Sequence, residues 1–272
     1  MPTQANVRVI DMRCLTLTAV TIAVLGSSQI FAQHREYNGP IGPAPVNAEG
    51  RIMLGAPPGE TKGVWTPLFG TRDPIAPVES IPFQSWSKSL YDARQLHELE
   101  PHARCKASGL TRQFLTPYGV EFVELTAQKK MLIFDIGGPH TYRTIYMDGR
   151  SHPVDPEPSN YGHSVGWWEG DTLVVDSIGF NEDFWFERRG LPHTEQLHTI
   201  ERITRLHEGV IQYRITVDDP GAYTAQWEGG INLQYNPDQV LFEYVCQQAN
   251  YAHELMVGQE STEVDRSSSI VP

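Results

Sequence analysis

Histidine, arginine and carboxylate residues gather in four stretches of this sequence, at residues 140–153, 162–176, 193–202 and 218–227. A neutral imidazole can transfer a proton near pH 7, an arginine can stabilise an oxyanion, and a carboxylate can fix the imidazole tautomer. Acid–base chemistry without a cofactor is therefore the first hypothesis. We interpret His140 and His198 as candidates for proton transfer, with Arg143 and Arg202 as anion stabilisers.

Spacing within a predicted strand limits how these groups combine. Successive side chains point to opposite faces of a strand, so His198 and Arg202 share one face and Glu201 lies on the other. A dyad of His198 with Glu201 is thereby disfavoured. We expect His198 and Arg202 to meet His140 or Arg143 from another strand.

A structural interpretation of the same residues stays open. Polar groups inside a barrel must be paired, and either arginine could neutralise a buried acid. Asp176 and Asp218 are the expected partners in such a network.

Residues 162–166 read Gly-His-Ser-Val-Gly and match the G-x-S-x-G elbow of α/β-hydrolases. That elbow needs a strand before the serine and a helix after it. Here a proline-rich loop precedes Ser164 and a predicted hairpin follows. We therefore interpret the glycines as permitting a tight strand entry, although Ser164, Asp176 and His198 occur in the order of a triad.

Cofactor and metal signatures are weak. Zinc and copper need three or four ligands in fixed geometry, and no HExxH or similar cluster occurs. No Gly-rich nucleotide-binding loop is visible. We predict no organic cofactor and assign no metal ligands, while the histidines leave a metal open.

Ligand binding is predicted from rings that could line a cavity for a flat or apolar molecule, although such rings more often belong to the core or its rim. The candidate binding residues are His152, His163, Tyr142, Trp168, Tyr213 and Trp227.

Short strands joined by hairpins must position these groups. Polar turns at 128–130, 169–171, 207–209 and 236–239 separate apolar runs, and Ile211 to Val217 alternates regularly. A strand is also predicted at 240–245. We predict a mainly β fold, an antiparallel meander forming a small barrel or strongly bent sheet that can hold one small ligand.

Four segments are predicted along the chain. A secretory signal spans residues 1–32, with Arg8 and Arg13 before an apolar run and a cut after Ala32. A Pro/Gly-rich arm with one helix at 84–98 spans 33–100, and Trp86, Leu90 and Ala93 are its expected apolar face. The β-barrel-like domain spans 101–250, and a tail spans 251–272.

Export and charge limit the partners. The signal predicts a periplasmic or secreted protein, and no later stretch is long and apolar enough to span a bilayer. The net charge of −12 opposes binding to nucleic acid or anionic lipid. A small molecule is the expected ligand or substrate.

Two cysteines, Cys105 and Cys246, remain after signal removal. In an oxidising compartment they predict one disulfide, worth roughly 4 kcal/mol in the loop-entropy model. Two free buried thiols are the alternative.

The combined motifs resemble a large family of secreted bacterial β-rich proteins known mainly as uncharacterised. They are H-x-x-R-x-I-x-x-D-G-R-x-H-P from His140, S-x-G-x-W-E-G-D-T-L-V-V-D around residues 164–176, L-H-x-x-E-R from Leu197, and E-Y-x-C ending at Cys246. The resemblance covers roughly residues 82–250. It implies a common β fold and brings no assigned activity.

The sequence thus predicts an exported, cofactor-independent enzyme acting on a small, largely apolar molecule, as a lyase, isomerase, cyclase or hydrolase. A non-catalytic periplasmic ligand-binding protein, or an accessory protein of the envelope, is the alternative.

Overall fold

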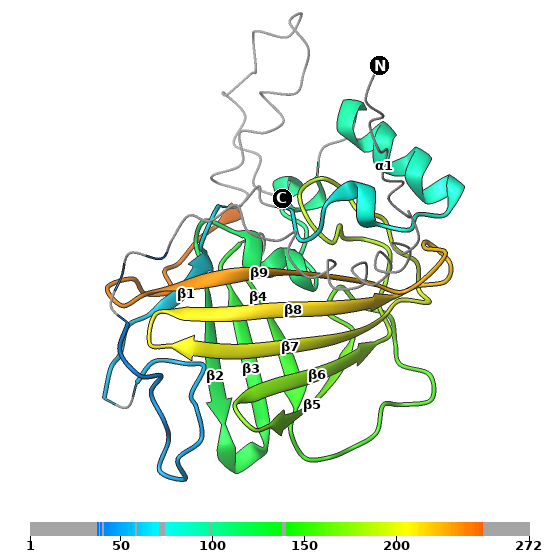
Figure 1. Cartoon of the computed structure of the whole chain (residues 1–272). Helices are drawn as coiled ribbons and strands as arrows, with labels where there is room; N and C mark the ends of the chain where they lie inside the picture. The colour runs from blue at the N-terminus through cyan, green and yellow to red at the C-terminus, as the bar shows by residue number, and fades with distance from the viewer. Residues whose placement is uncertain are drawn as a thin grey trace, which may run out of the picture. The chain divides into compact units, whose positions relative to one another are not determined.

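A closed β-barrel dominates the structure (Figure 1). The structure, a computed structural model, describes residues 37, 39, 41–57, 59–70, 74–97, 100–137 and 140–246. Nine strands within these residues close in the order β1 to β9, which confirms the predicted mainly β fold. The predicted signal at 1–32 and tail at 251–272 lie outside the described residues.

Hydrogen bonds join each strand to the next along the chain, and β9 pairs with β1 to close the barrel. The strands are β1 (Val64–Pro67), β2 (Val120–Leu125), β3 (Lys130–Asp135), β4 (Thr141–Tyr146), β5 (His163–Glu169), β6 (Thr172–Ile178), β7 (His198–His207), β8 (Val210–Asp218) and β9 (Trp227–Asn236). All pairs are antiparallel except β4 with β5, which run parallel because the long connection 147–162 returns the chain to the end where β4 began.

Strand β1 comes from the segment that the sequence analysis assigns to the arm. Trp65 is buried, and its indole donates a hydrogen bond to the Leu54 carbonyl at 2.8 Å. Pro67, which lacks an N–H, ends the strand, where the loss of a ladder bond costs least. The barrel therefore begins before residue 101.

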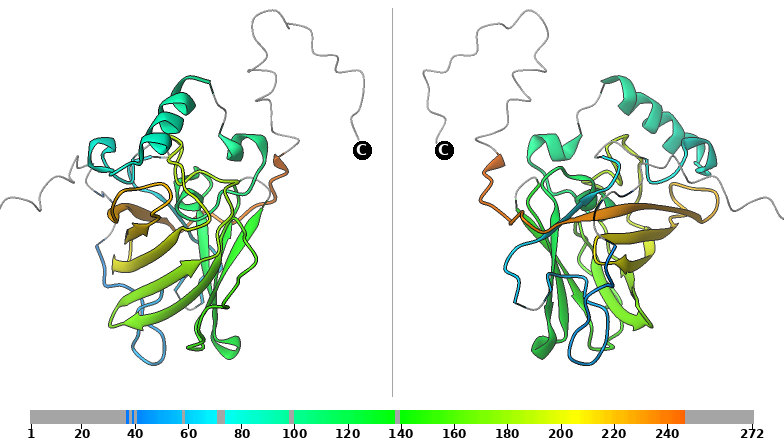
Figure 2. Two further views of the ribbon diagram at one scale, coloured as in Figure 1. Left: turned by 90° about the vertical axis from the view of Figure 1, so that its right-hand side faces the viewer. Right: turned by 60° about the vertical axis from the view of Figure 1, so that its left-hand side comes forward.

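Helical segments cluster around the barrel end that carries the connections after β6 and β8 (Figure 2). They are α1 (Ser85–His97) and the 3-10 helices η1 (Val78–Ser80), η2 (Pro101–Arg104) and η3 (Thr111–Leu115), while η4 (Thr126–Gln128) lies in the β2–β3 hairpin. The predicted apolar face of α1 is wrong, because Trp86 is 46% exposed while Ser87 and Tyr91 are buried. The Ser87 hydroxyl donates to the Ala222 carbonyl, which fixes this face inward.

The strand predicted at residues 240–245 is also wrong, since no regular element is assigned there. The chain instead leads to Cys246, which forms a disulfide with Cys105 across a sequence separation of 141 residues. Their Cα atoms lie 5.7 Å apart, within the normal range for disulfides. The predicted disulfide is confirmed, and it ties the end of η2 to the end of the described chain.

Alternating side chains of the strands fill the barrel. Ile211, Tyr213 and Ile215 of β8 point inward and are at most 1% exposed, as their alternation predicts. They join one hydrophobic cluster that also contains Phe114 of η3 and Phe122 of β2. No described helix is long and apolar enough to cross a membrane.

Candidate functional site

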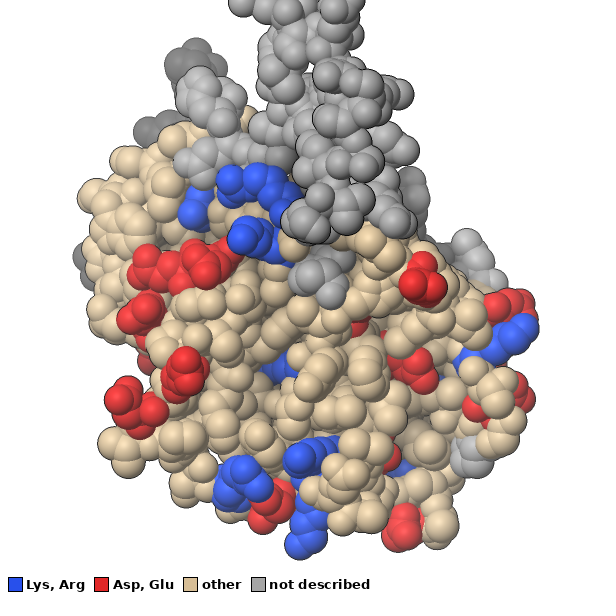
Figure 3. All heavy atoms as spheres, turned by 180° about the vertical axis from the view of Figure 1, so that it is seen from behind, with Lys and Arg blue, Asp and Glu red and all other residues tan. Residues whose placement is uncertain are grey.

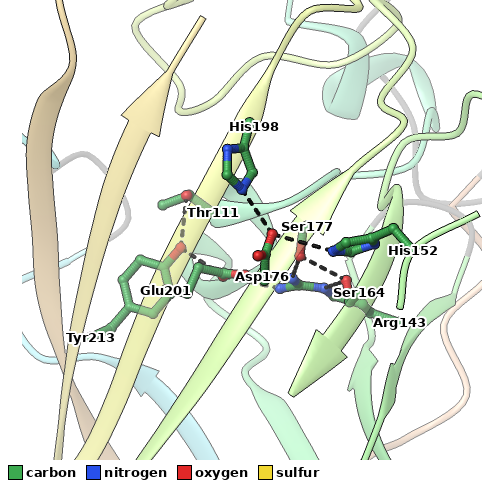
Figure 4. A network of polar contacts seen from close by, with 9 residues as sticks. All are labelled: Thr111, Arg143, His152, Ser164, Asp176, Ser177, His198, Glu201 and Tyr213. Carbon is green, nitrogen blue, oxygen red and sulfur yellow. Dashed lines mark hydrogen bonds and ion pairs between the residues drawn. The ribbon is translucent and has the colours of Figure 1, made fainter. Parts of the chain in front are cut away.

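Arg143 of β4 lies inside the barrel and forms a two-pronged ion pair with Glu201 of β7 (Figure 4). Its Nη1 donates to Glu201 Oε1 at 3.0 Å, and its Nη2 donates to Glu201 Oε2. Ser164 and Ser177 accept the remaining bonds, from Nε at 3.0 Å and from Nη2 at 2.8 Å. The two charged side chains are 1% and 0% exposed, so the guanidinium and carboxylate neutralise each other out of contact with water.

Tyr213 and Thr111 complete this inner network. The Tyr213 hydroxyl donates to Glu201 Oε1 at 2.9 Å and lies 3.0 Å from the Thr111 hydroxyl. Burial raises the pKa of Tyr213 well above its usual value, and the Glu201 charge adds to the shift. Burial alone lowers the pKa of Arg143, but Glu201 outweighs it and the net shift is upward. Tyr213 therefore stays protonated and Arg143 stays charged near neutral pH, as a structural network requires.

A second cluster lies on the outer face of the same wall, around Asp176 of β6 (Figure 4). Asp176 follows Val175 and precedes Ser177, two residues that point inward, so its own carboxylate points outward. His198, at the start of β7, places Nε2 at 2.8 Å from Asp176 Oδ1. Their side chains are 42% and 26% exposed, so a solute can reach this pair.

His152 and His163 extend the cluster along the surface. The Nε2 atom of His152 lies 3.3 Å from Asp176 Oδ1, and its Nδ1 lies 2.8 Å from Nδ1 of His163. Burial, with the nearby His152 and Arg150, lowers the pKa of His163 and favours its neutral form. The Nε2 atom of His152 makes no hydrogen bond to a described residue, so its contact with Asp176 is electrostatic and the hydrogen-bonded chain does not continue from the two histidines to the carboxylate.

His198 is the member best placed to meet a substrate. Asp176 accepts from Nε2–H and so fixes the tautomer in which Nδ1 carries a lone pair. No hydrogen bond from a described residue occupies that Nδ1 atom. A carboxylate that orients an imidazole whose other nitrogen is free is the arrangement used in general base catalysis.

The four candidate catalytic residues do not meet. His198 and Arg202 share the outer face of β7, as predicted, but Arg143 faces inward. Arg202 pairs with Glu169 at 2.7 Å on the surface. His140 precedes β4 in a left-handed backbone conformation (φ 54°), and its Nε2 accepts the Tyr244 backbone N–H at 2.7 Å.

The buried structural network predicted as the alternative is present, but with a different acid. Arg143 pairs with Glu201, and it pairs with neither Asp176 nor Asp218. Asp176 instead contacts His198 and His152, while Asp218 accepts a bond from Gln226. The pattern in the sequence offers Glu201 only as a partner of His198, because the two residues lie close together along one strand.

The six candidate binding residues are dispersed over the fold. His152 and His163 belong to the outer cluster, and Tyr213 belongs to the inner network. Tyr142 is 60% exposed on β4, and Trp227 packs against Tyr223 at the start of β9. Trp168 lies near the other end of the barrel, beneath the guanidinium of Arg51.

His193 also stays outside the cluster. It is buried against Phe184, with ring centroids 4.1 Å apart, and its Nε2 lies 2.8 Å from the Asn181 carbonyl. Burial lowers its pKa to about 4. His193 is therefore a neutral core residue near pH 7.

A buried acid that the sequence analysis did not single out lies at the end of β3. Asp135 accepts a bond from Ser108 at 2.6 Å and from the Gly137 backbone at 2.8 Å, and Ser108 also contacts His102 Nδ1 at 2.9 Å. Burial raises the pKa of Asp135 to about 7 and lowers that of His102 to about 4. The only signal in the sequence was an acid closing an apolar run.

Ser164 does not occupy a nucleophile elbow. It lies within β5 and faces the interior, where its hydroxyl contacts Ser177 at 2.9 Å. Asp176 and His198 lie on the opposite face, so the three residues cannot act as a triad. Among the described residues, no group of three or more His, Cys, Asp or Glu is arranged to hold a metal ion.

Comparison with known proteins adds no relative: no family model, no curated protein and no solved structure matches the chain. The resemblance to secreted bacterial β-rich proteins therefore stays a prediction. The function has to be argued from the geometry alone.

Proposed function

We propose that the protein is an exported enzyme that transfers protons on a small molecule without an organic cofactor. His198 accepts or donates the proton, and Asp176 orients its ring. His152 and His163 lie beside the pair and place two further imidazoles on the same surface. The periplasmic or secreted location is part of the proposal and rests on the signal predicted at residues 1–32.

One observation carries the proposal: Nε2 of His198 bonds to the Asp176 carboxylate at 2.8 Å, while 42% of the imidazole side chain remains exposed. The carboxylate thus orients the ring while Nδ1 stays open to a solute. The proposed site lies on the outer face of the barrel wall. Its polar surroundings there favour a substrate with polar groups over a largely apolar one held inside the barrel.

The substrate is sought among esters, lactones and carbon acids that can undergo elimination or isomerisation, each offered to the purified protein without cofactor. We expect His198→Gln to lower kcat/KM by about 10²- to 10⁴-fold on any substrate that is turned over, because the proton acceptor is lost. The reaction class found decides between lyase, isomerase, cyclase and hydrolase.

His207→Gln is the matched control, because His207 lies at the opposite end of β7 and bonds only to the Gly209 backbone among the described residues. This variant should keep the wild-type kcat/KM. Turnover that survives in His198→Gln contradicts the assignment. A protein that turns over nothing in the panel supports the alternative of a non-catalytic binding or envelope accessory protein.

A further inference from the structure

A cavity of about 330 Å³ opens at the end of the barrel where the β2–β3 and β5–β6 hairpins lie. Arg51, Lys129 and Lys130 line it together with the apolar side chains of Trp168 and Met147. The strand β5 separates this cavity from the histidine cluster, since His163 begins the strand and Trp168 lies near its end. The cavity is therefore a distinct place in the molecule, independent of the proposed proton-transfer site.

The charges around the cavity do not cancel. Its two acids already have partners, since Glu124 pairs with Arg51 at 2.5 Å and Asp148 pairs with Arg150 at 2.6 Å. Lys129 and Lys130 form no ion pair with any described residue, and the Lys130 ammonium lies 5.7 Å from the centre of the Tyr146 ring. Basic side chains, with acidic ones between them, lie along the lower edge of Figure 3, the end of the barrel where the β2–β3 hairpin lies.

Two details describe how the cations around the cavity are held. Arg51 stacks its guanidinium over Trp168, 4.4 Å from the ring centre. Lys129 caps the end of η4 in a left-handed backbone (φ 50°), and its N–H donates to the Thr126 carbonyl. In a chain with 33 acidic and 21 basic residues, two lysines without an ion pair in one cavity reverse the prevailing sign.

We propose that this cavity binds a small organic carboxylate that carries a flat ring. The carboxylate accepts hydrogen bonds from the two lysine ammonium groups, beside the positive charge of Arg51. The ring contacts Trp168 and the Met147 thioether, while the Arg51 guanidinium, 4.4 Å from the centre of the Trp168 ring, holds the indole in place. The volume matches the lower end of the range for small-molecule sites.

The test titrates the full chain with 2-naphthoate and with its neutral analogue 2-naphthamide, and follows the indole N–H of Trp168 by NMR. That signal is assigned by its loss in Trp168→Phe. We expect 2-naphthoate to shift the Trp168 signal and to bind about tenfold more tightly than 2-naphthamide, because only the carboxylate meets the unpaired cations. Added salt should weaken the binding.

The double variant Lys129→Gln, Lys130→Gln should weaken 2-naphthoate binding by about tenfold, and Lys106→Gln, an exposed lysine outside the cavity, should leave it unchanged. Circular dichroism establishes that each variant is folded. Equal binding of acid and amide, wild-type affinity in the double variant, or no shift of the Trp168 signal would each overturn the proposal.

Discussion

The inner network around Arg143 and the outer cluster around Asp176 lie on the two faces of one barrel wall, and they use the same kinds of residue in different ways. Inside, Arg143 and Glu201 are at most 1% exposed, and the guanidinium nitrogens all donate within the network. Outside, Asp176 and His198 share one hydrogen bond, and both are open to water.

Neighbouring residues of one strand thus serve opposite purposes. Ser177 belongs to the inner network, whereas Asp176, next to it on β6, orients His198 outside. A buried ion pair resists change because either partner alone would be a charge without water. An exposed dyad can gain or lose a proton at little cost to the fold. Burial therefore separates the residues that hold the barrel from those available for chemistry.

The largest expected effect comes from breaking the inner pair. Glu201→Gln should lower the free energy of unfolding by about 3–5 kcal/mol, because Arg143 stays buried with its charge uncompensated. Urea denaturation measures the change. The adjacent outer-face variant Arg202→Gln is the control, and its exposed pair with Glu169 should contribute about 1 kcal/mol or less.

Loss of activity in folded Glu201→Gln, with little loss of stability, would contradict a purely structural role of the inner network. The double variant Arg143→Met, Glu201→Gln tests that role further. Removing the unpaired guanidinium should recover part of the lost stability.

The next largest effects concern two buried groups, which make the free energy of unfolding depend on pH with opposite signs. His193 has a pKa of about 4 in the folded protein, below its ordinary 6.5. Between pH 6.5 and 4 the unfolded chain binds a proton at His193 that the folded protein does not. The free energy of unfolding therefore falls as the pH is lowered through this range, by roughly 3 kcal/mol in all. His193→Gln should flatten the fall, as measured by urea denaturation across this range.

Asp135 acts with the opposite sign, because burial raises its pKa from 3.8 to about 7. Between these values the folded protein holds the proton that the unfolded chain has released, so stability falls as pH rises. Asp135→Asn removes this loss and should make stability rise more steeply with pH than in the wild type. Slopes that change in the same direction in both variants would contradict the burial of one of the two groups.

Local patterns were enough to predict the barrel and the faces of its strands. The alternation in β8 placed Tyr213 inside, and the spacing in β7 separated His198 and Arg202 from Glu201. The disulfide is predicted because two cysteines remain after signal removal and an oxidising compartment favours their pairing. These predictions succeed because a two-residue period and a pair of thiols leave few alternatives.

Contacts between distant strands could not be predicted in the same way. Arg143 and Glu201 are 58 residues apart, and no local rule pairs β4 with β7 across the barrel interior. His152 reaches Asp176 from an irregular connection whose path periodicity does not reveal. His140 was grouped with His198 by residue type alone, and the fold places it beside Tyr244 instead.

The central claim, that Asp176 prepares His198 for proton transfer, is tested most directly by the imidazole ¹⁵N shifts of His198 at neutral pH. We expect a proton on Nε2 and an unprotonated Nδ1 in the wild type, and loss of this preference in Asp176→Asn. A proton fixed on Nδ1, or an unchanged tautomer in Asp176→Asn, would contradict it.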